Sequence, residues 1–245
     1  MTPIKITVNP SVGGPLSNTI LRRLPREVFS SLLPDMRSVA LHLGHTLYEV
    51  RDDIGYLYFP ERGCMLSLLA GGEDGGGIEI GVTGCEGFAG VTAILGNQVA
   101  SHRILVQLGG SATRIKASAV RRGFAENEQM RNLLLGYLNT LFAQISQTAL
   151  CNRVHTVEER LARWVLVTAD RAPVHGELPL THEFLARMLG VNRSTLSLTA
   201  SMFQQASFIA YRRGKLKIVD RDGLEGVACS CYGIVKEYVD DFVGK

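Results

Sequence analysis

The sequence predicts an α+β protein in which an antiparallel β domain comes first, one long helix follows, and short helices with a β-ribbon end the chain. Three observations predict this order. Short apolar runs alternate with glycine clusters from Val39 to Ala119, about 25 residues from Glu126 have the spacing of an amphipathic helix, and helix-capping residues recur after Thr181. The expected units are a β domain at 1–125, a long helix at 126–152 and a C-terminal domain at 153–245.

The chain has 245 residues, of which 46% are hydrophobic and 20% are charged. This composition is typical of a folded protein long enough for two domains. Its five scattered cysteines, an odd number, do not form the framework of a disulfide-stapled protein. The sequence shows no N-terminal signal pattern and no apolar stretch of the roughly 20 residues that span a bilayer. We therefore expect a cytoplasmic protein with reduced thiols and no membrane partner.

The β domain is predicted from short apolar runs. Residues 1–18 form a loose lead-in, and 21–33 has helical spacing that stops before Pro34. Five short apolar runs then follow at 46–50, 56–59, 65–69, 78–80 and 104–108, and glycines interrupt them at 71–72, 75–77, 84 and 109–110. Many short strands with turn signals at near-regular spacing are typical of an antiparallel sandwich or barrel.

The long helix carries apolar residues at three- and four-residue steps. The stripe consists of Leu134, Leu138, Leu141 and Ile145, widened by Tyr137, Phe142 and Ala149. Such a stripe buries against its own domain or against the same helix of a second subunit, and the sequence leaves both open. A further helix is expected at 157–169, and the turn residues at 172–176 end it.

Two short helices joined by a tight turn are predicted after Pro179. Thr181 can cap the first helix, and Gly190 permits the left-handed backbone that ends it. Asn192 can cap a second helix, which runs from Arg193 to about Gln205. The buried side of this helix would be Leu196, Ala200 and Phe203, and the other side would show Arg193, Ser194, Ser197, Leu198 and Ser201. This is the helix-turn-helix pattern, whose second helix enters the major groove of DNA.

A basic hairpin follows, with strands expected at 208–212 and 215–219 around a turn at Arg213 and Gly214. Six basic residues and one acid give 180–219 a net charge of 6 − 1 = +5, whereas 220–245 forms an acidic tail of 3 − 6 = −3. The alternative is an ordinary helical hairpin with a surface ribbon. The basic ribbon and the scarcity of acids favour a DNA-binding wing that contacts phosphates.

The candidate DNA-binding residues lie on the second helix, at its caps and on the wing. They are Thr181, Asn192, Arg193, Ser194, Thr195, Ser197, Leu198, Arg212, Arg213 and Lys215. Arg193 can donate two hydrogen bonds to a guanine edge, and Ser and Thr can reach a base or a phosphate.

Several segments carry a resemblance to a known family. They are 178–196 with Ile209 and the ribbon, Tyr-Phe-Pro at 58–60, Met-Leu-Ser-Leu at 65–68, Gly-Cys-Glu-Gly-Phe-Ala-Gly at 84–90 and Val-Gln-Leu-Gly at 106–109. The chain resembles the Crp/Fnr family of bacterial transcription regulators over nearly its whole length. The resemblance implies a jelly-roll-like β-roll of the cyclic-nucleotide-binding type, a long dimerisation helix and a winged helix-turn-helix. It also implies a homodimer through about 126–151, a near-palindromic site on double-stranded DNA, and contact with RNA polymerase.

The resemblance places Arg193 where the family commonly has a base-reading arginine. Members that respond to cyclic AMP have a glutamate next to this arginine, where this chain has Ser194, and a further arginine where it has Leu198. DNA binding is still expected, with a different target sequence.

The candidate effector residues are Glu86, Gly87, Ser101, His102 and Arg103. In relatives that bind cyclic nucleotides, a glycine, a glutamate and an arginine followed by Ser or Thr hold the phosphate. Here Ser101 precedes the arginine and Ile104 follows it, which favours a surface role for Arg103 over a nucleotide site. If a ligand does switch the protein, it would reset the spacing of the two recognition helices through the long helix.

The sequence assigns no definite cofactor: a cyclic nucleotide stays a disfavoured candidate, and no iron–sulfur cluster is expected. An iron–sulfur cluster needs about four cysteine ligands, and this sequence has none before Cys64. Cys229 and Cys231 are too closely spaced for the usual cluster or zinc motif. His42, His45 and His102 give haem no evident anchor.

Two rival functions remain open at this point. A cupin-like enzyme would want several histidines on the barrel strands, and His-Glu-x-x-His, Gly-x-Ser-x-Gly and Ser-x-x-Lys motifs are absent, so we expect neither a catalytic nor a metal site. The second rival is a sensor that acts through protein partners and carries a degenerate winged helix. Metal analysis tests the first rival, and DNA binding by Arg193→Ala tests the second.

Overall fold

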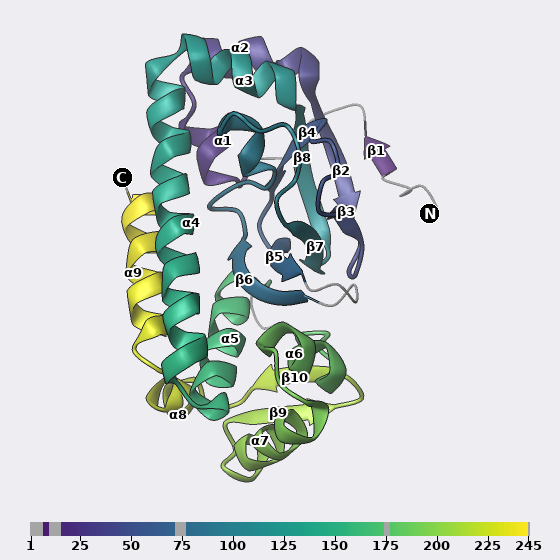
Figure 1. Ribbon diagram of the computed structural model, residues 1–245, viewed down its shortest axis with the longest axis vertical. Helices are drawn as coiled ribbons and strands as arrows, with labels where there is room; N and C mark the ends of the chain where they lie inside the picture. Colours follow the sequence, from purple (N-terminus) through teal and green to yellow (C-terminus); the bar gives the residue numbers. More distant parts are fainter. Residues whose placement is uncertain (1–6, 10–15, 72–76, 174–176, 245) are drawn as a thin grey trace.

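The computed structural model describes residues 7–9, 16–71, 77–173 and 177–244. A β domain forms its upper part, a long helix runs down one side, and a smaller domain of helices with a β-hairpin lies below (Figure 1). The predicted glycine turn at 72–76, the end of the lead-in at 10–15 and the turn residues 174–176 lie outside the described residues.

Two antiparallel sheets form the β domain within the described ranges. One has the order β1-β2-β8-β4, and the other has the order β3-β7-β5-β6. Their strands are β1 (Thr7–Asn9), β2 (Met36–Leu41), β3 (Thr46–Tyr48), β4 (Tyr56–Pro60), β5 (Met65–Gly71), β6 (Gly77–Thr83), β7 (Arg103–Leu108) and β8 (Gly110–Lys116). All of the pairings within these sheets are antiparallel, which confirms the predicted β-roll.

Strands β2 and β8 were not predicted from the sequence, and the predicted break at 109–110 lies where β8 begins. Gly110 is a glycine of close approach, because an added Cβ would lie 2.9 Å from the Cβ of Cys64. The helix expected at 21–33 is split into α1 (Thr19–Arg23) and α2 (Arg26–Leu32), followed by the 3-10 turn η1 (Leu33–Asp35). Pro25 explains the split, since the residue before a proline is forced out of the helical region.

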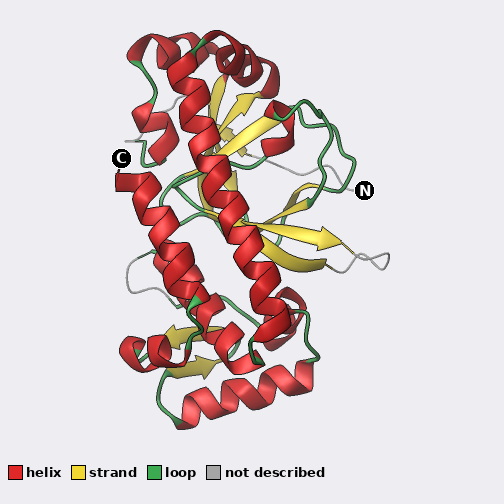
Figure 2. Cartoon of the chain, turned by 60° about the vertical axis from the view of Figure 1, so that its left-hand side comes forward, coloured by secondary structure: helices red, strands yellow, loops and turns green. Residues whose placement is uncertain are grey.

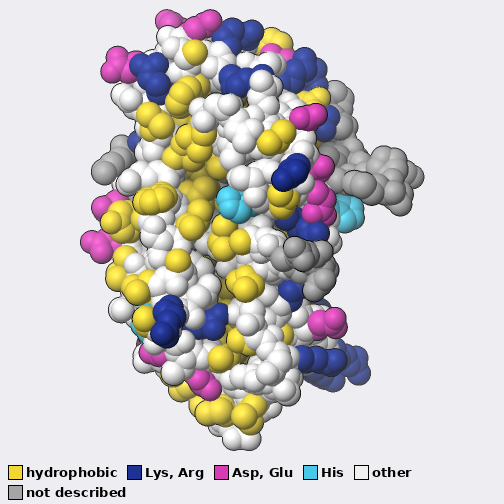
Figure 3. Space-filling view, in the orientation of Figure 1, with side chains coloured by type: hydrophobic (Ala, Val, Ile, Leu, Met, Phe, Trp, Pro, Cys, Tyr) yellow, Lys and Arg dark blue, Asp and Glu magenta, His cyan; other side chains and the backbone are white. Residues whose placement is uncertain are grey.

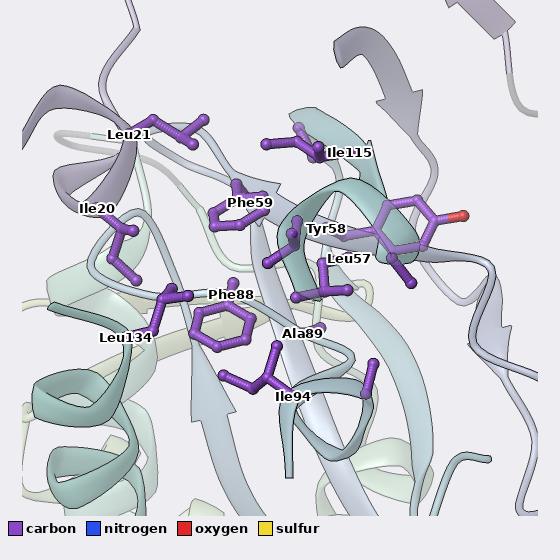
Figure 4. Close-up of a cluster of buried hydrophobic side chains, with 14 of the residues drawn as sticks. Ile20, Leu21, Leu57, Tyr58, Phe59, Phe88, Ala89, Ile94, Ile115 and Leu134 are labelled. Atoms are coloured by element: carbon purple, nitrogen blue, oxygen red, sulfur yellow. The ribbon is translucent and has the colours of Figure 1, made fainter. Parts of the chain in front are cut away.

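A layer of aromatic and aliphatic side chains joins the two sheets to the helices. The rings of Phe59 and Phe88 stack with their centroids 5.4 Å apart, and Phe88 also lies 5.1 Å from the ring of Tyr137. Figure 4 shows Ile20 and Leu134 beside Phe88, so that α1 and the long helix close the same core. The β domain and the long helix are therefore one packed unit.

The long helix α4 (Glu128–Val154) confirms the prediction of a helix at 126–152. A helix that the sequence analysis missed, α3 (Ala117–Glu126), precedes it, and η2 (Val91–Ile94) is a short 3-10 turn. The predicted stripe is divided between two faces of α4. Leu134, Tyr137 and Leu141 are buried against the β domain, whereas Phe142 is 70% exposed.

The C-terminal domain begins with α5 (Val157–Arg171), whose capping box pairs Thr156 with Glu159. It continues with α6 (His182–Leu189), α7 (Arg193–Gln205), β9 (Ile209–Arg212), β10 (Lys215–Ile218), α8 (Arg221–Val227) and α9 (Cys231–Gly244). The acidic tail is thus two helices. In both Figure 1 and Figure 2, α9 lies beside α4, and the ring of Phe242 packs 6.0 Å from that of Tyr137. None of the described helices is long and apolar enough to cross a membrane.

Candidate nucleic-acid interface

Side-chain caps build the turn between α6 and α7. The Thr181 hydroxyl accepts a hydrogen bond from the Phe184 amide at 3.1 Å, and Gly190 ends α6 in the left-handed conformation with φ 63°. The Asn192 carboxamide oxygen accepts from the amide of Thr195 at 2.8 Å and so caps α7. Both caps and the glycine lie where the sequence predicts them.

Helix α7 has one buried and one exposed face. Leu196, Ala200 and Phe203 are buried, as predicted. Arg193 and Ser194 are exposed in the first turn, and Leu198 is 66% exposed one turn later. The positive end of the helix dipole and a guanidinium therefore share one uncovered end, which is suited to a negatively charged partner.

A histidine that the sequence analysis did not single out supports this face. His182 Nδ1 lies 3.0 Å from the Ser197 hydroxyl, and its ring packs 4.4 Å from the ring of Tyr211 on β9. Burial and the charge of Arg193 lower the pKa of His182. The Tyr211 hydroxyl donates to the Leu180 carbonyl at 2.6 Å. His182 thereby joins the recognition helix to the wing, and no linear motif signals such a contact.

The wing is the β9–β10 hairpin. Its register pairs Lys215 with Arg212, and both residues of its two-residue turn have positive φ, 51° at Arg213 and 76° at Gly214. This is the geometry of a tight hairpin turn that matches the strand twist. Arg212, Arg213 and Lys215 are all exposed, and dark blue side chains gather at the lower right of Figure 3, where the hairpin ends.

The candidate DNA-binding residues lie at the caps of α6 and α7, on α7 and on the wing, and they have different roles. Arg193, Leu198, Arg212 and Arg213 are exposed. Lys215 is exposed and makes a surface ion pair with Glu177 at 2.9 Å, which solvent screens. Among the remaining candidates, the oxygens of Thr181 and Asn192 serve as caps, Ser194 donates to Asn192, Ser197 contacts His182 and Thr195 is half-buried.

The candidate effector residues do not gather around one space. Glu86 is buried and accepts a hydrogen bond from the Arg171 guanidinium on α5 at 2.8 Å. Gly87 touches α4 so closely that an added Cβ would lie 2.0 Å from the Tyr137 ring. Arg103 makes an ion pair with Glu49 at 2.6 Å. Ser101 and His102 line a cavity of about 20 Å³ beside Phe88, Ala89 and Gly90, which is room for about one water molecule.

Potential metal ligands cluster outside both of these regions. In the parts of the chain that the structure describes, one group of three or more such side chains is close enough to share an ion, and it lies at the end of α4. It consists of Cys151, His155, Cys229 and Cys231. The cupin-like enzyme would need its ligands on the barrel strands, and this group is not there.

Comparisons with known proteins agree with this architecture. Residues 159–227 match the family model described as a Crp-like helix-turn-helix domain. A Crp/Fnr-family regulator candidate from Eubacterium rectale is similar at 17% identity, with a TM-score of 0.69 over 85% of this chain and 96% of that chain. No curated protein sequence matches the chain.

Two further solved structures have the same fold. FixK2 from Bradyrhizobium japonicum is 15% identical, with a TM-score of 0.67 over 78% of this chain and 96% of that chain. TTHB099, a Crp-family transcriptional regulator from Thermus thermophilus, is 17% identical, with a TM-score of 0.65 over 77% and 95%. The resemblance seen in the sequence is confirmed for the helix-turn-helix domain at 159–227 and for the fold of the 77–85% of the chain that these structures cover.

Proposed function

We propose that this protein is a sequence-specific transcription regulator that binds DNA as a homodimer and reads a near-palindromic site. The observation that carries the proposal is the uncovered outer face of α7, where exposed Arg193 opens the helix and His182 joins the helix to the basic wing. The match of residues 159–227 to a Crp-like helix-turn-helix domain supports the same role.

In this proposal, α7 enters the major groove and the wing contacts the backbone. Arg193 donates two hydrogen bonds to the O6 and N7 of a guanine, which is the commonest specific contact in protein–DNA complexes. Arg212, Arg213 and Lys215 contact phosphates and set the register without reading sequence. Leu198, exposed by 66%, is suited to the methyl group of a thymine. Ser194 and Leu198 together favour a target that differs from that of the regulators that respond to cyclic AMP.

The proposed homodimer forms through the outer face of α4. Leu135, Leu138, Phe142, Ile145 and Ala149 follow one another at alternating three- and four-residue steps, and each is exposed or half-exposed in the single chain. This is the spacing of two helices that pack side by side. Hydrophobic side chains form a vertical band on this side of the molecule (Figure 3). A two-fold dimer presents two copies of α7 to two half-sites and so reads a palindrome.

The partners and the compartment follow from this role. Contact with RNA polymerase is part of the proposal on the strength of the family resemblance, and a cytoplasmic location is part of it because the proposed role needs access to DNA. We include no cyclic nucleotide. The cavity in the β-roll is about 20 Å³, and the residues that would hold a phosphate are dispersed or already paired. An effector of other chemistry would act by shifting the two α7 helices relative to each other.

DNA selection with the purified full chain tests the proposal. We expect enrichment of an inverted repeat whose half-sites lie about one helical turn apart, 10 to 10.5 base pairs between centres. The selection is repeated with cyclic AMP and cyclic GMP, which we expect to leave the enriched sequence unchanged. Failure to enrich an inverted repeat under any of these conditions would contradict the proposal.

A further inference from the structure

Three cysteines and a histidine from distant parts of the sequence meet where α4 ends. Cys151 lies in the last turn of α4 and His155 is its C-terminal cap, whereas Cys229 and Cys231 lie where α8 gives way to α9. The sulfur and nitrogen atoms of the four side chains all lie within 4.8 Å of one another. Cys151 Sγ is 3.5 Å from Cys229 Sγ, and Cys231 Sγ is 3.5 Å from His155 Nδ1.

Local backbone geometry brings each pair of side chains together. Cys151 and His155 are four residues apart, so they lie on the same face of a helix. The His155 amide still donates to the Cys151 carbonyl at 3.1 Å, which continues the helical pattern to the cap. The Tyr232 amide donates to the Cys229 carbonyl at 3.0 Å, and this tight turn brings two thiols together with one residue between them. Cys229 and Cys231, too closely spaced to suggest a motif alone, are joined by a second pair from α4.

We propose that Cys151, His155, Cys229 and Cys231 bind one zinc ion in a tetrahedral site. Zinc binds thiolate sulfur at about 2.3 Å and imidazole nitrogen at about 2.0–2.1 Å, so neighbouring ligands of a tetrahedral ion are about 3.5–3.8 Å apart. The two measured separations of 3.5 Å agree with this spacing. Three of the side chains, Cys151, Cys229 and Cys231, are buried, and His155 is half-buried.

The donor set favours a single zinc ion over other groups. Soft thiolates with an imidazole in a tetrahedral arrangement select zinc among the common ions. The four protein ligands of an iron–sulfur cluster are spread over at least two iron atoms, so some of them lie farther apart than the ligands of a single ion, whereas all four donor atoms here lie within 4.8 Å of one another. Four protein ligands also leave no open coordination position, which is typical of a structural zinc site.

The surroundings complement the charge of such a site. One zinc ion with three thiolates and a neutral histidine carries a net charge of −1. Gln147 Nε2 donates to Cys231 Sγ at 3.1 Å, the kind of outer contact that orients a ligand. Arg163, 7% exposed, donates to the Thr148 hydroxyl at 3.4 Å, and its Nε has no hydrogen-bond partner within the described part of the chain. Its charge acts on both Cys151 and Glu79, so an anionic site would help to offset this buried cation.

The position of the site says what the ion would do. His155 ends α4, and α5 begins two residues later, so the ion would hold the bend between the dimerisation helix and the DNA-binding domain. Through Cys229 and Cys231 it would also pin the start of α9, which packs along α4. The effect on DNA binding rests on the proposed function, whereas the metal site itself does not.

Metal analysis of the reduced full chain, followed by cobalt substitution, tests the site. We expect one zinc ion per chain after purification without added metal. After the protein is stripped with a chelator, Co²⁺ should give the thiolate charge-transfer band and the visible bands of a tetrahedral site, and Zn²⁺ should abolish them. Cys151→Ser and Cys229→Ser should each lose the stoichiometric zinc, whereas the matched control Cys85→Ser, from the β domain, should keep it. Gln147→Ala should weaken zinc binding by about tenfold.

The same measurements can overturn the proposal. It fails if neither zinc nor cobalt binds the reduced wild-type chain at one ion per chain. It also fails if iron and inorganic sulfide are found in place of zinc, or if Cys151→Ser and Cys229→Ser keep the wild-type cobalt spectrum. The cobalt spectrum of the wild-type chain tests the site without any variant, so the test is decisive even if a variant does not fold. None of these outcomes depends on DNA, so DNA selection can fail while the zinc site holds.

Discussion

The outer faces of α4 and α7 are both uncovered in the single chain, and their side chains differ in kind. Helix α4 shows an apolar stripe that includes Leu135 and Phe142, whereas α7 shows Arg193 and Ser194 before two exposed apolar residues, Leu198 and Met202. An exposed apolar stripe is stabilised when another apolar surface covers it and removes it from water. A helix N-terminus that carries an arginine is stabilised by a negatively charged partner. The difference is the basis of the proposal that α4 forms the dimer and α7 reads DNA.

The largest effect is expected from a charge in the apolar stripe. Phe142→Asp would bury two unpaired carboxylates in the proposed dimer interface and remove two aromatic rings from it. We expect a monomer by sedimentation velocity at micromolar concentration. Affinity for a full palindrome should fall by roughly 100-fold or more, because the two half-sites are then bound independently.

A matched control carries the same charge elsewhere. Leu43, 46% exposed on the loop after β2, is remote from the stripe, so Leu43→Asp should leave a dimer with wild-type affinity. A Phe142→Asp protein that remains dimeric would show that α4 is not the assembly face.

The contact between the β domain and α5 belongs to neither outer face, and we expect its contribution to stability to depend on pH. Burial raises the pKa of Glu79 to about 7 from its ordinary value of 4.5, against the hydrogen bond from Ser67 and the charge of Arg163. The folded protein thus holds a proton that the unfolded chain has already released between pH 4.5 and about 7, so its stability falls as pH rises through this window. Relative to Glu79→Gln, the free energy of unfolding of the wild type should fall by about 2 kcal/mol, with allowance for partial exposure.

Urea unfolding of the two proteins at several pH values measures this difference. Parallel pH profiles for the wild type and Glu79→Gln would contradict the assignment of the proton to Glu79. DNA specificity should be the same in both proteins, because Glu79 lies on neither outer face.

The turn before α7 depends on the left-handed backbone of Gly190. Gly190 has φ 63°, and an added Cβ would lie 2.9 Å from the end of the Ile78 side chain. Gly190→Ala should lower the free energy of unfolding by about 1–2 kcal/mol, because an L-residue in the left-handed region is strained. Gly233→Ala in α9 meets nothing within 4 Å and should raise it by about 0.5–1 kcal/mol. Thermal or urea unfolding measures both changes, and a change of the same sign in the free energy of unfolding for Gly190→Ala and Gly233→Ala would contradict this account.

The smallest effect is expected on the wing. Arg212→Ala should weaken binding uniformly across DNA sequences and reduce the slope of log affinity against log salt by about 1, since it removes a single phosphate contact. Arg26→Ala, at an exposed position on α2, is the control and should leave the slope unchanged. A change in sequence preference for Arg212→Ala would mean that the wing reads bases.

The two faces also differ in how well the sequence predicts them. The helix-turn-helix that presents the α7 face can be predicted from local sequence. Thr181 and Asn192 each cap an amide three residues away, and Gly190 supplies the left-handed conformation that ends α6. Periodicity predicts α4 as a helix. It could not divide the stripe, because the fold decides that Tyr137 packs on Phe88 while Phe142 stays uncovered.

The features that could not be predicted from the sequence depend on contacts between distant residues. Strand β8 starts at a glycine that reads as a break until Cys64 is seen to pack against it. Glu86 looked like an effector residue, and its partner Arg171 lies 85 residues away. The sequence gives only the spacing of the cysteines along the chain, whereas their proximity in space arises from the packing of α9 against α4. None of these contacts between distant residues produces a hydrophobic periodicity or a capping motif that could be recognised in the sequence.

The most direct test of the central claim pairs one side chain with one base. The affinities of the wild type and Arg193→Ala are measured on the selected palindrome and on variants with each base pair replaced in turn. Arg193→Ala should lose about 1–3 kcal/mol on the parent site and lose its discrimination at one guanine, at equivalent positions in both half-sites. Unchanged affinity and an unchanged pattern of base preference would contradict the assignment of α7 as the DNA-reading helix.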